Sequence, residues 1–270
     1  MSLEELKTAL PKPDQLSPAE IEAKAESLGV SKSKMGFIQS FMLSIMAGAF
    51  ISMGAMFFLL IVSDSALPFA AQRLIGGCLF SLGLLLVVVC GAELFTGNTM
   101  IVMSAASRKI TWLAVLKNWL VVFFGNFVGA LIMVGLVYLS NFQSMNGGAV
   151  GTAIVSVAAG KMTPDWLTLF AKGIMCNFLV CLAVWMAFCA ASAGGKVISL
   201  YGPIFIFVLC GFEHSVANMY YIPAGIFLCK NGELSWLSMV QNLLPVTLGN
   251  LVGGCALGCI LYLLYGRKSA

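Results

Sequence analysis

The sequence contains few charged residues. Only 10% of its 270 residues are Asp, Glu, Lys or Arg, whereas a soluble domain has about 25%. In contrast, 60% are hydrophobic, and the mean hydropathy is +0.98. This composition excludes an ordinary cytosolic globule, a disordered chain and a nucleic-acid-binding protein. It is typical of a membrane protein with several spans.

Patterns that bind metals or carry out catalysis are also missing. The chain has one histidine, and none of its nine cysteines has a CxxC or Cys/His metal spacing. The cysteines lie in or beside apolar runs, so we expect them to pack as small residues between helices. The sequence contains no GxSxG and no Walker motif. It therefore predicts neither an enzyme nor a metal or cofactor site.

The first 35 residues are polar and precede the apolar runs. They contain a helix-capping pattern, formed by Ser17, Pro18 and Glu20. Apolar residues at helical spacing follow, at Ile21, Ala25 and Leu28. This spacing predicts a short amphipathic helix on the membrane surface or against the bundle. We therefore divide the chain into a cytoplasmic N-terminal segment, 1–35, and a six-span transmembrane domain, 36–270.

Six apolar runs are long enough to cross a bilayer, which takes about 20 residues. They cover residues 37–63, 71–106, 111–140, 166–193, 197–229 and 242–265. The second and fifth runs are too long for simple helices, and each has a glutamate near its middle, Glu93 and Glu213. Irregular backbone at membrane depth must line a cavity or be buried in protein. We therefore expect a broken helix in each of these two spans.

The two halves of the chain share a sequence pattern. One element is an asparagine followed seven residues later by Gly-Asn, at Asn118 with Gly125-Asn126 and at Asn242 with Gly249-Asn250. Another is a glutamate followed five residues later by an asparagine, at Glu93 with Asn98 and at Glu213 with Asn218. With three spans in each half, the halves must have opposite orientations. The predicted fold is an all-α membrane protein of two inverted three-helix repeats, with a substrate site where the breaks meet.

Basic residues indicate the orientation. With the N-terminus in the cytoplasm, the inner flanks hold eleven Lys and Arg, and the outer flanks hold only Arg73, Lys161, Lys172 and Lys230. The positive-inside rule then predicts a protein of the inner (plasma) membrane with both termini in the cytoplasm.

The fifth-span break contains the only histidine, in Gly211-Phe212-Glu213-His214-Ser215. An ionisable group at membrane depth is a candidate for function, although a neutral histidine could merely hold the break in place. Thr96 offers a hydroxyl at the other break. We expect one half-helix to begin near Asn98 and another after His214, with their N–H groups directed at the same region. Such a site suits a small anion.

Three other charged residues lie near these breaks. Glu93 and Glu213 could form a proton relay or a cation site. Because they occupy equivalent positions, we favour a supporting role in which each carboxylate accepts backbone N–H bonds from the following half-helix. Asn98 and Asn218 would support the same loops. Lys161, in the outer connection, could attract anions to a pore mouth or simply be solvated.

Together these motifs resemble the formate/nitrite transporter family, which are pentameric small-anion channels with an aquaporin-like protomer fold. The resemblance is carried by Gly91–Asn98, Lys117–Trp119 with Gly125-Asn126, Cys176–Met186, Gly211–Met219 and Leu244–Asn250. It runs from about residue 30 to the end of the chain and implies a homopentamer without a cofactor.

The resemblance also implies roles for single residues. His214 would be the central histidine, Thr96 its hydrogen-bonding partner, and Lys161 the lysine that attracts anions from outside. The apolar constrictions would be formed by Leu94, Phe80 and Leu84 on the inner side and by Phe207 on the outer side. Asn177 and Asn250 would be polar residues lining the pore.

The substrate implied by the resemblance is a small monovalent anion, with formate first. The run Cys78–Leu84 resembles formate channels, whereas Thr96–Met100 is closer to the nitrite branch, and hydrosulfide channels share the threonine, lysine and histidine. If His214 protonates a weakly basic anion, the neutral acid crosses apolar constrictions more easily, which predicts proton-linked passage at low pH. Two other classes remain: a neutral-solute channel of the aquaporin type, disfavoured because paired Asn-Pro-Ala boxes are missing, and a membrane anchor that transports nothing.

Overall fold

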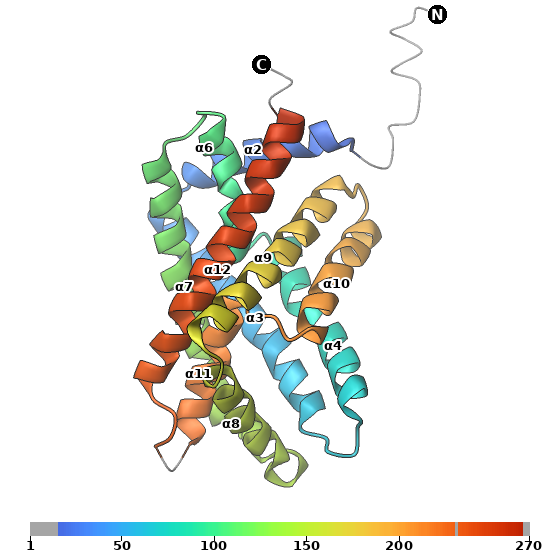
Figure 1. Ribbon diagram of the computed structural model, residues 1–270, viewed down its shortest axis with the longest axis vertical. Helices are drawn as coiled ribbons and strands as arrows, with labels where there is room; N and C mark the ends of the chain where they lie inside the picture. Colours follow the sequence, from blue (N-terminus) through green and yellow to red (C-terminus); the bar gives the residue numbers. More distant parts are fainter. Residues whose placement is uncertain (1–15, 230–231, 267–270) are drawn as a thin grey trace, which may run out of the picture.

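The computed structural model describes residues 16–229 and 232–266, which form a bundle of helices (Figure 1). The α-helices are α2 (Pro18–Ser33), α3 (Phe37–Val62), α4 (Phe69–Val89), α5 (Phe95–Asn98), α6 (Val102–Ala106), α7 (Trp112–Leu139), α8 (Ala149–Met162), α9 (Trp166–Cys189), α10 (Ala193–Leu209), α11 (Ser215–Leu228) and α12 (Trp236–Leu261). Short turns of other helix types are η1 (Thr99–Ile101), η2 (Phe142–Ser144), η3 (Asn146–Gly148) and η4 (Tyr262–Gly266).

The predicted spans and both predicted breaks are confirmed. Five helices are long and apolar enough to cross a membrane, namely α3, α4, α7, α9 and α12 with η4. The second span is α4 followed by α5, η1 and α6, and the fifth is α10 followed by α11. Their breaks fall at residues 90–94 and 210–214. Glu93 and Glu213 therefore lie in the non-helical segments, as the sequence predicts.

The helices of the two halves pack in the same way. In the first half, α3 packs against α4 and α7, and in the second half α9 packs against α10 and α12. Small residues let these helices approach closely, because Gly125 of α7 faces α3 and Gly249 of α12 faces α9. A Cβ on Gly249 would lie 3.0 Å from the Cα of Gly173 on α9. This packing confirms the repeat.

The helices that follow the breaks cross into the opposite half. The segment α5–η1–α6 packs against α9 and α12, whereas α11 packs against α7 and α3. Each half therefore inserts its second half-helix into the other. The two halves meet in addition through α4 and α10.

The N-terminal helix α2 lies against the bundle. Its predicted cap is confirmed, because the Ser17 side chain accepts a bond from the Glu20 backbone and the Glu20 side chain accepts one from the Ser17 backbone. Ile21 and Ala25 are buried, and α2 packs against α6, α9 and η4 at the end of α12. Helices α2 and α6 lie at one end of the molecule, and α8 lies toward the opposite end (Figure 1).

Some predicted boundaries are wrong. Helix α8 lies in the connection before the fourth span and packs against α11, and none of the six apolar runs predicts it. The sixth span begins at Trp236, six residues earlier than expected, where the Ser235 side chain accepts a bond from the Ser238 backbone. The half-helix of the second span begins at Phe95 rather than near Asn98. Five of the basic residues used to predict the orientation lie outside the described residues, namely Lys7, Lys12, Lys230, Arg267 and Lys268.

Candidate functional site

The two broken spans turn at equivalent glycines. Gly91 and Gly211 both have φ of +69°, in the left-handed region that favours glycine. After each turn the backbone bonds to the first helix of its own half. Glu93 N donates to Leu43 O at 3.2 Å, and Glu213 N donates to Lys172 O at 3.3 Å. Each break is therefore attached to the helix beside it.

Two buried asparagines hold the breaks and cap the half-helices. The Oδ1 atom of Asn126 accepts from Phe95 N at 2.9 Å, and its Nδ2 donates to the Glu93 and Ser44 carbonyls at 2.9 and 2.8 Å. Asn250 repeats this pattern: its Oδ1 accepts from Ser215 N at 2.9 Å, and its Nδ2 donates to the Glu213 and Gly173 carbonyls at 3.0 and 2.8 Å. Both asparagines are fully buried. They satisfy backbone groups that would otherwise be unpaired at membrane depth.

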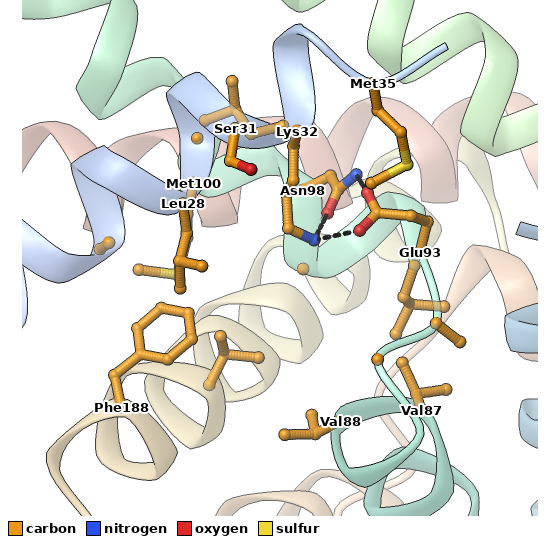
Figure 2. A pocket seen from close by; sticks show the side chains of 18 of the residues that line it. Leu28, Ser31, Lys32, Met35, Val87, Val88, Glu93, Asn98, Met100 and Phe188 are labelled. Atoms are coloured by element: carbon orange, nitrogen blue, oxygen red, sulfur yellow. Dashed lines mark hydrogen bonds and ion pairs between the residues drawn. The ribbon is translucent and has the colours of Figure 1, made fainter. Parts of the chain in front are cut away.

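The glutamates bind side chains rather than backbone N–H groups. Glu93 accepts from Lys32 Nζ at 2.8 Å and from Asn98 Nδ2 at 2.7 Å (Figure 2). Glu213 accepts from Lys161 Nζ at 3.0 Å and from Asn218 Nδ2 at 2.7 Å. The prediction that the carboxylates cap the half-helices is therefore wrong. Each glutamate instead lies in a lysine–glutamate–asparagine cluster that compensates its buried charge.

A second asparagine completes each cluster. Asn98 Nδ2 also donates to Asn118 Oδ1 at 3.0 Å, and Asn218 Nδ2 donates to Asn242 Oδ1 at 2.8 Å. These four asparagines belong to the repeated sequence pattern, together with Asn126 and Asn250. The pattern therefore encodes a hydrogen-bond network in each half.

The side chains of Thr96 and His214 meet in the interior. Thr96 Oγ1 lies 2.9 Å from His214 Nε2, and both residues are buried. Ala217 N donates to His214 Nδ1 at 3.1 Å. Because this backbone group can only donate, Nδ1 is the acceptor, and the proton of the neutral ring is on Nε2. Nε2–H therefore donates to the threonine hydroxyl.

Two cavities approach this pair from opposite ends. One cavity, of about 310 Å³, lies beside α2 and is called the inner cavity; residues that line it include Lys32, Leu84, Leu94 and Phe188 (Figure 2). The other, called the outer cavity, has a volume of about 330 Å³, and residues that line it include His214, Phe207, Phe80 and Lys161.

Two buried phenylalanine rings line the outer cavity beside His214. The Phe207 ring lies 5.5 Å from that of Phe80, edge to face, and 6.0 Å from that of His214, between ring centroids. The grouping of Phe80 with Leu84 and Leu94 is therefore wrong. Phe80 forms a pair with Phe207 on the outer side, whereas the two leucines line the inner cavity.

Asn177 and Asn250 line neither cavity. Asn177 Nδ2 donates to the carbonyls of Thr96 and Asn250, at 3.2 and 2.7 Å, and to Thr99 Oγ1 at 3.0 Å. Asn177 is fully buried, as is Asn250. The expectation that these residues line a pore is not met, because the Asn177 amide bonds the backbone at Thr96 and the Asn250 amide bonds the break before Ser215.

The chain's relationships agree with this architecture. The family model described as formate/nitrite transporter matches residues 19–264. The chain belongs to the formate/nitrite transporter family. It is 38% identical to the formate channel FocA of Escherichia coli strain K12, in an alignment that covers 95% of this chain and 96% of FocA.

Solved structures of this family share the fold. A structure described as a pentameric formate channel with formate bound is 38% identical, with a TM-score of 0.81, covering 86% of this chain and 98% of that one. An FNT family ion channel is 28% identical, with a TM-score of 0.83, covering 93% and 99%. The protein is therefore a multi-pass member of a family of transporters and channels.

Several residues of the site could not be predicted from the sequence. Lys32 lies in the N-terminal segment, and no local pattern connects it to Glu93, which is 61 residues away. Trp119 Nε1 donates to Asn98 O at 3.0 Å. The repeated pattern includes Asn118, Asn126 and Asn242. Their shared spacing is the feature of the sequence that could have predicted their position at the breaks.

Proposed function

We propose that the protein is a channel for small monovalent anions and that formate is its main substrate. The observation that carries this proposal is the Thr96–His214 hydrogen bond between two cavities that approach it from opposite ends. The FocA relative and the formate-bound structure support formate as the substrate. Nitrite and hydrosulfide are the alternatives.

The proposed pathway combines apolar barriers with a polar centre. Leu84 and Leu94 on one side, and Phe80 and Phe207 on the other, are each at most 4% exposed. Apolar constrictions disfavour hydrated ions. Between them, the Nε2–H of His214 and the Thr96 hydroxyl offer hydrogen bonds that replace part of the water around an anion.

Proton-linked passage requires a second state of His214. An imidazolium needs a proton on Nδ1, which must displace the Ala217 N–H that now donates to this atom. From that state Nε2 can transfer its proton to a formate oxygen, so that the N–H bond breaks and an O–H bond forms. The products are neutral imidazole and formic acid, and the neutral acid crosses the apolar constrictions at lower cost. We therefore expect conduction of the anion near neutral pH and proton uptake with formate at low pH.

The proposed assembly is a homopentamer in the inner (plasma) membrane. A pentameric relative supports the oligomeric state. The α2 end is placed in the cytoplasm because most basic residues of the sequence lie on that side. Lys161 lines the cavity at the other end, where it would attract anions in addition to pairing with Glu213.

Flux in proteoliposomes tests this function, with formate, nitrite and hydrosulfide offered separately at pH 7 and pH 5. Current and internal pH are recorded together. We expect a saturating formate current at pH 7 and proton uptake with formate at pH 5. Flux of only nitrite or hydrosulfide would change the substrate, and the lack of any anion flux would contradict the proposed function.

Two variants of His214 separate its roles. His214→Asn keeps an oxygen that can accept from Ala217 N, and His214→Gln keeps a longer amide that can reach toward Thr96. Neither titrates, so we expect both to lose proton uptake at pH 5. His214→Gln should keep more of the formate current at pH 7. Unchanged proton uptake in both variants would contradict the proton-transfer role of His214.

A further inference from the structure

The outer cavity contains more positive than negative charge. Three cationic residues, Arg73, Lys161 and Lys172, and one acidic residue, Glu213, line it. Lys161 forms an ion pair with Glu213, since its Nζ lies 3.0 and 3.2 Å from the two carboxylate oxygens. Across residues 16–229 and 232–266, neither Arg73 nor Lys172 forms an ion pair. The cavity is therefore suited to an anion.

Arg73 is held in place without using most of its donors. Its guanidinium lies over the rings of Phe69 and Phe58, with Cζ 5.5 and 5.7 Å from the ring centroids. Its hydrogen bond in the described part of the chain runs from Nη1 to Val208 O, at 3.4 Å. A guanidinium has five N–H donors. Most of them therefore have no acceptor among these residues, although the two rings fix the plane of the group.

Gly211 makes room beside this group. A Cβ at Gly211 would lie 3.2 Å from Arg73 Nη2. The glycine therefore keeps one edge of the guanidinium uncovered at the turn that leads to His214. Phe207 and Phe80 line the same cavity. An anion bound to Arg73 is thus already in the space that borders the central pair.

We propose that Arg73 forms a capture site at the outer mouth for planar anions with two oxygen atoms. This site would select such anions before they reach the constriction formed by Phe80 and Phe207. This inference rests on the proposed anion-channel function. A guanidinium binds such an anion through two parallel N–H···O bonds, whereas an ammonium acts as a point charge. Formate and nitrite match this geometry, and hydrosulfide has only one heavy atom. Lys172 adds positive charge without the planar recognition.

Three variants separate planar recognition from charge. Arg73→Lys keeps the charge and the contact with the rings but loses the planar group. Arg73→Gln loses both, and Lys172→Gln removes one unpaired charge from the same cavity. We expect Arg73→Lys to raise the half-saturating formate concentration about tenfold, Arg73→Gln to raise it further, and Lys172→Gln to raise it about twofold. Thermal melting of each purified variant in detergent serves as the control for folding.

The test combines flux with binding of ¹³C-formate to the full-length protein in nanodiscs, followed by NMR titration. Wild-type binding and flux that both weaken in Arg73→Lys would support the inference. Equal values for Arg73→Lys and wild type would overturn it, as would equal shifts in Arg73→Lys and Lys172→Gln. If the wild type binds formate through Arg73 but conducts no anion, the capture site is supported while the proposed function fails.

Discussion

The two broken spans have the same framework but hold different side chains at the same position. In each, a glycine turns the chain, an asparagine from the third helix of the half caps the half-helix, and a glutamate binds a lysine and an asparagine. Leu94 follows the glutamate in the first break, and His214 follows it in the second. The repeat therefore maintains a scaffold, and the difference between these two residues gives the site its polarity.

The cations of the two clusters come from elements outside the repeated spans. Lys32 comes from α2, and Lys161 comes from α8, in the connection between the halves. Their side chains are 26% and 15% exposed, respectively. The lysine of the first cluster is therefore more accessible to water than that of the second, and its ion pair is screened more strongly.

The largest effect is expected from the capping asparagines. Asn126→Ala and Asn250→Ala each remove three hydrogen bonds and leave a buried backbone N–H and two buried carbonyls without these partners. We expect each variant to lose about 3 kcal/mol or more of stability. Thermal melting in detergent measures the loss. If one variant melts like the wild type and the other does not, the equivalence of the two breaks is contradicted.

Replacing the lysine of either cluster should cost less stability than replacing a capping asparagine, and the two lysines should differ. Lys161→Met and Lys32→Met each leave a buried glutamate without its cation; because both lysines are partly exposed, we expect losses below those of the asparagine variants and below the ~3–5 kcal/mol of a fully buried pair. We expect the loss to be smaller for Lys32, because its side chain is more exposed. Melting temperatures of the two variants, compared in the same detergent, measure the difference. A larger loss in Lys32→Met would reverse this ranking.

The smallest effect concerns Glu22, which belongs to α2 and has no equivalent in the second half. Burial and the nearby Glu26 raise the pKa of Glu22, and Lys109 opposes this change. A carboxyl with a raised pKa in the docked state favours docking as the pH falls through that pKa. We therefore expect α2 amides to exchange more slowly at pH 5 than at pH 7, after correction for intrinsic rates.

The variant Glu22→Gln removes this charge and should slow α2 exchange at pH 7 while leaving pH 5 nearly unchanged. Hydrogen exchange followed by mass spectrometry provides the readout. Faster exchange of α2 in Glu22→Gln at pH 7 would show that the charged carboxylate stabilises docking instead.

The positions of the spans, the breaks and the central residues could be predicted from the sequence. Long apolar runs interrupted by Glu93 and Glu213 predicted where the helices break, and the resemblance predicted the Thr96–His214 pair. Both depend on local patterns. The repeated asparagines were recognised as a pattern, but which groups they bond was not evident.

Contacts between distant segments could not be predicted in this way. The partners of Glu93 and Glu213 come from α2 and α8, and nothing in the local sequence ties these elements to the breaks. The pairing of Phe80 with Phe207 similarly depends on how α4 packs against α10. Helix α8 was missed because it is only 14 residues long, too short to be recognised as a span.

The order of residues along the chain has a consequence for biosynthesis. Lys32 precedes Glu93 by 61 residues, and Lys161 precedes Glu213 by 52. During translation, each cation is therefore made before the carboxylate that it neutralises. A lone acidic side chain at the centre of a membrane helix costs about 2.5–3.5 kcal/mol on insertion. Glu93 and Glu213 thus reach the bilayer after their counter-charges have been synthesised.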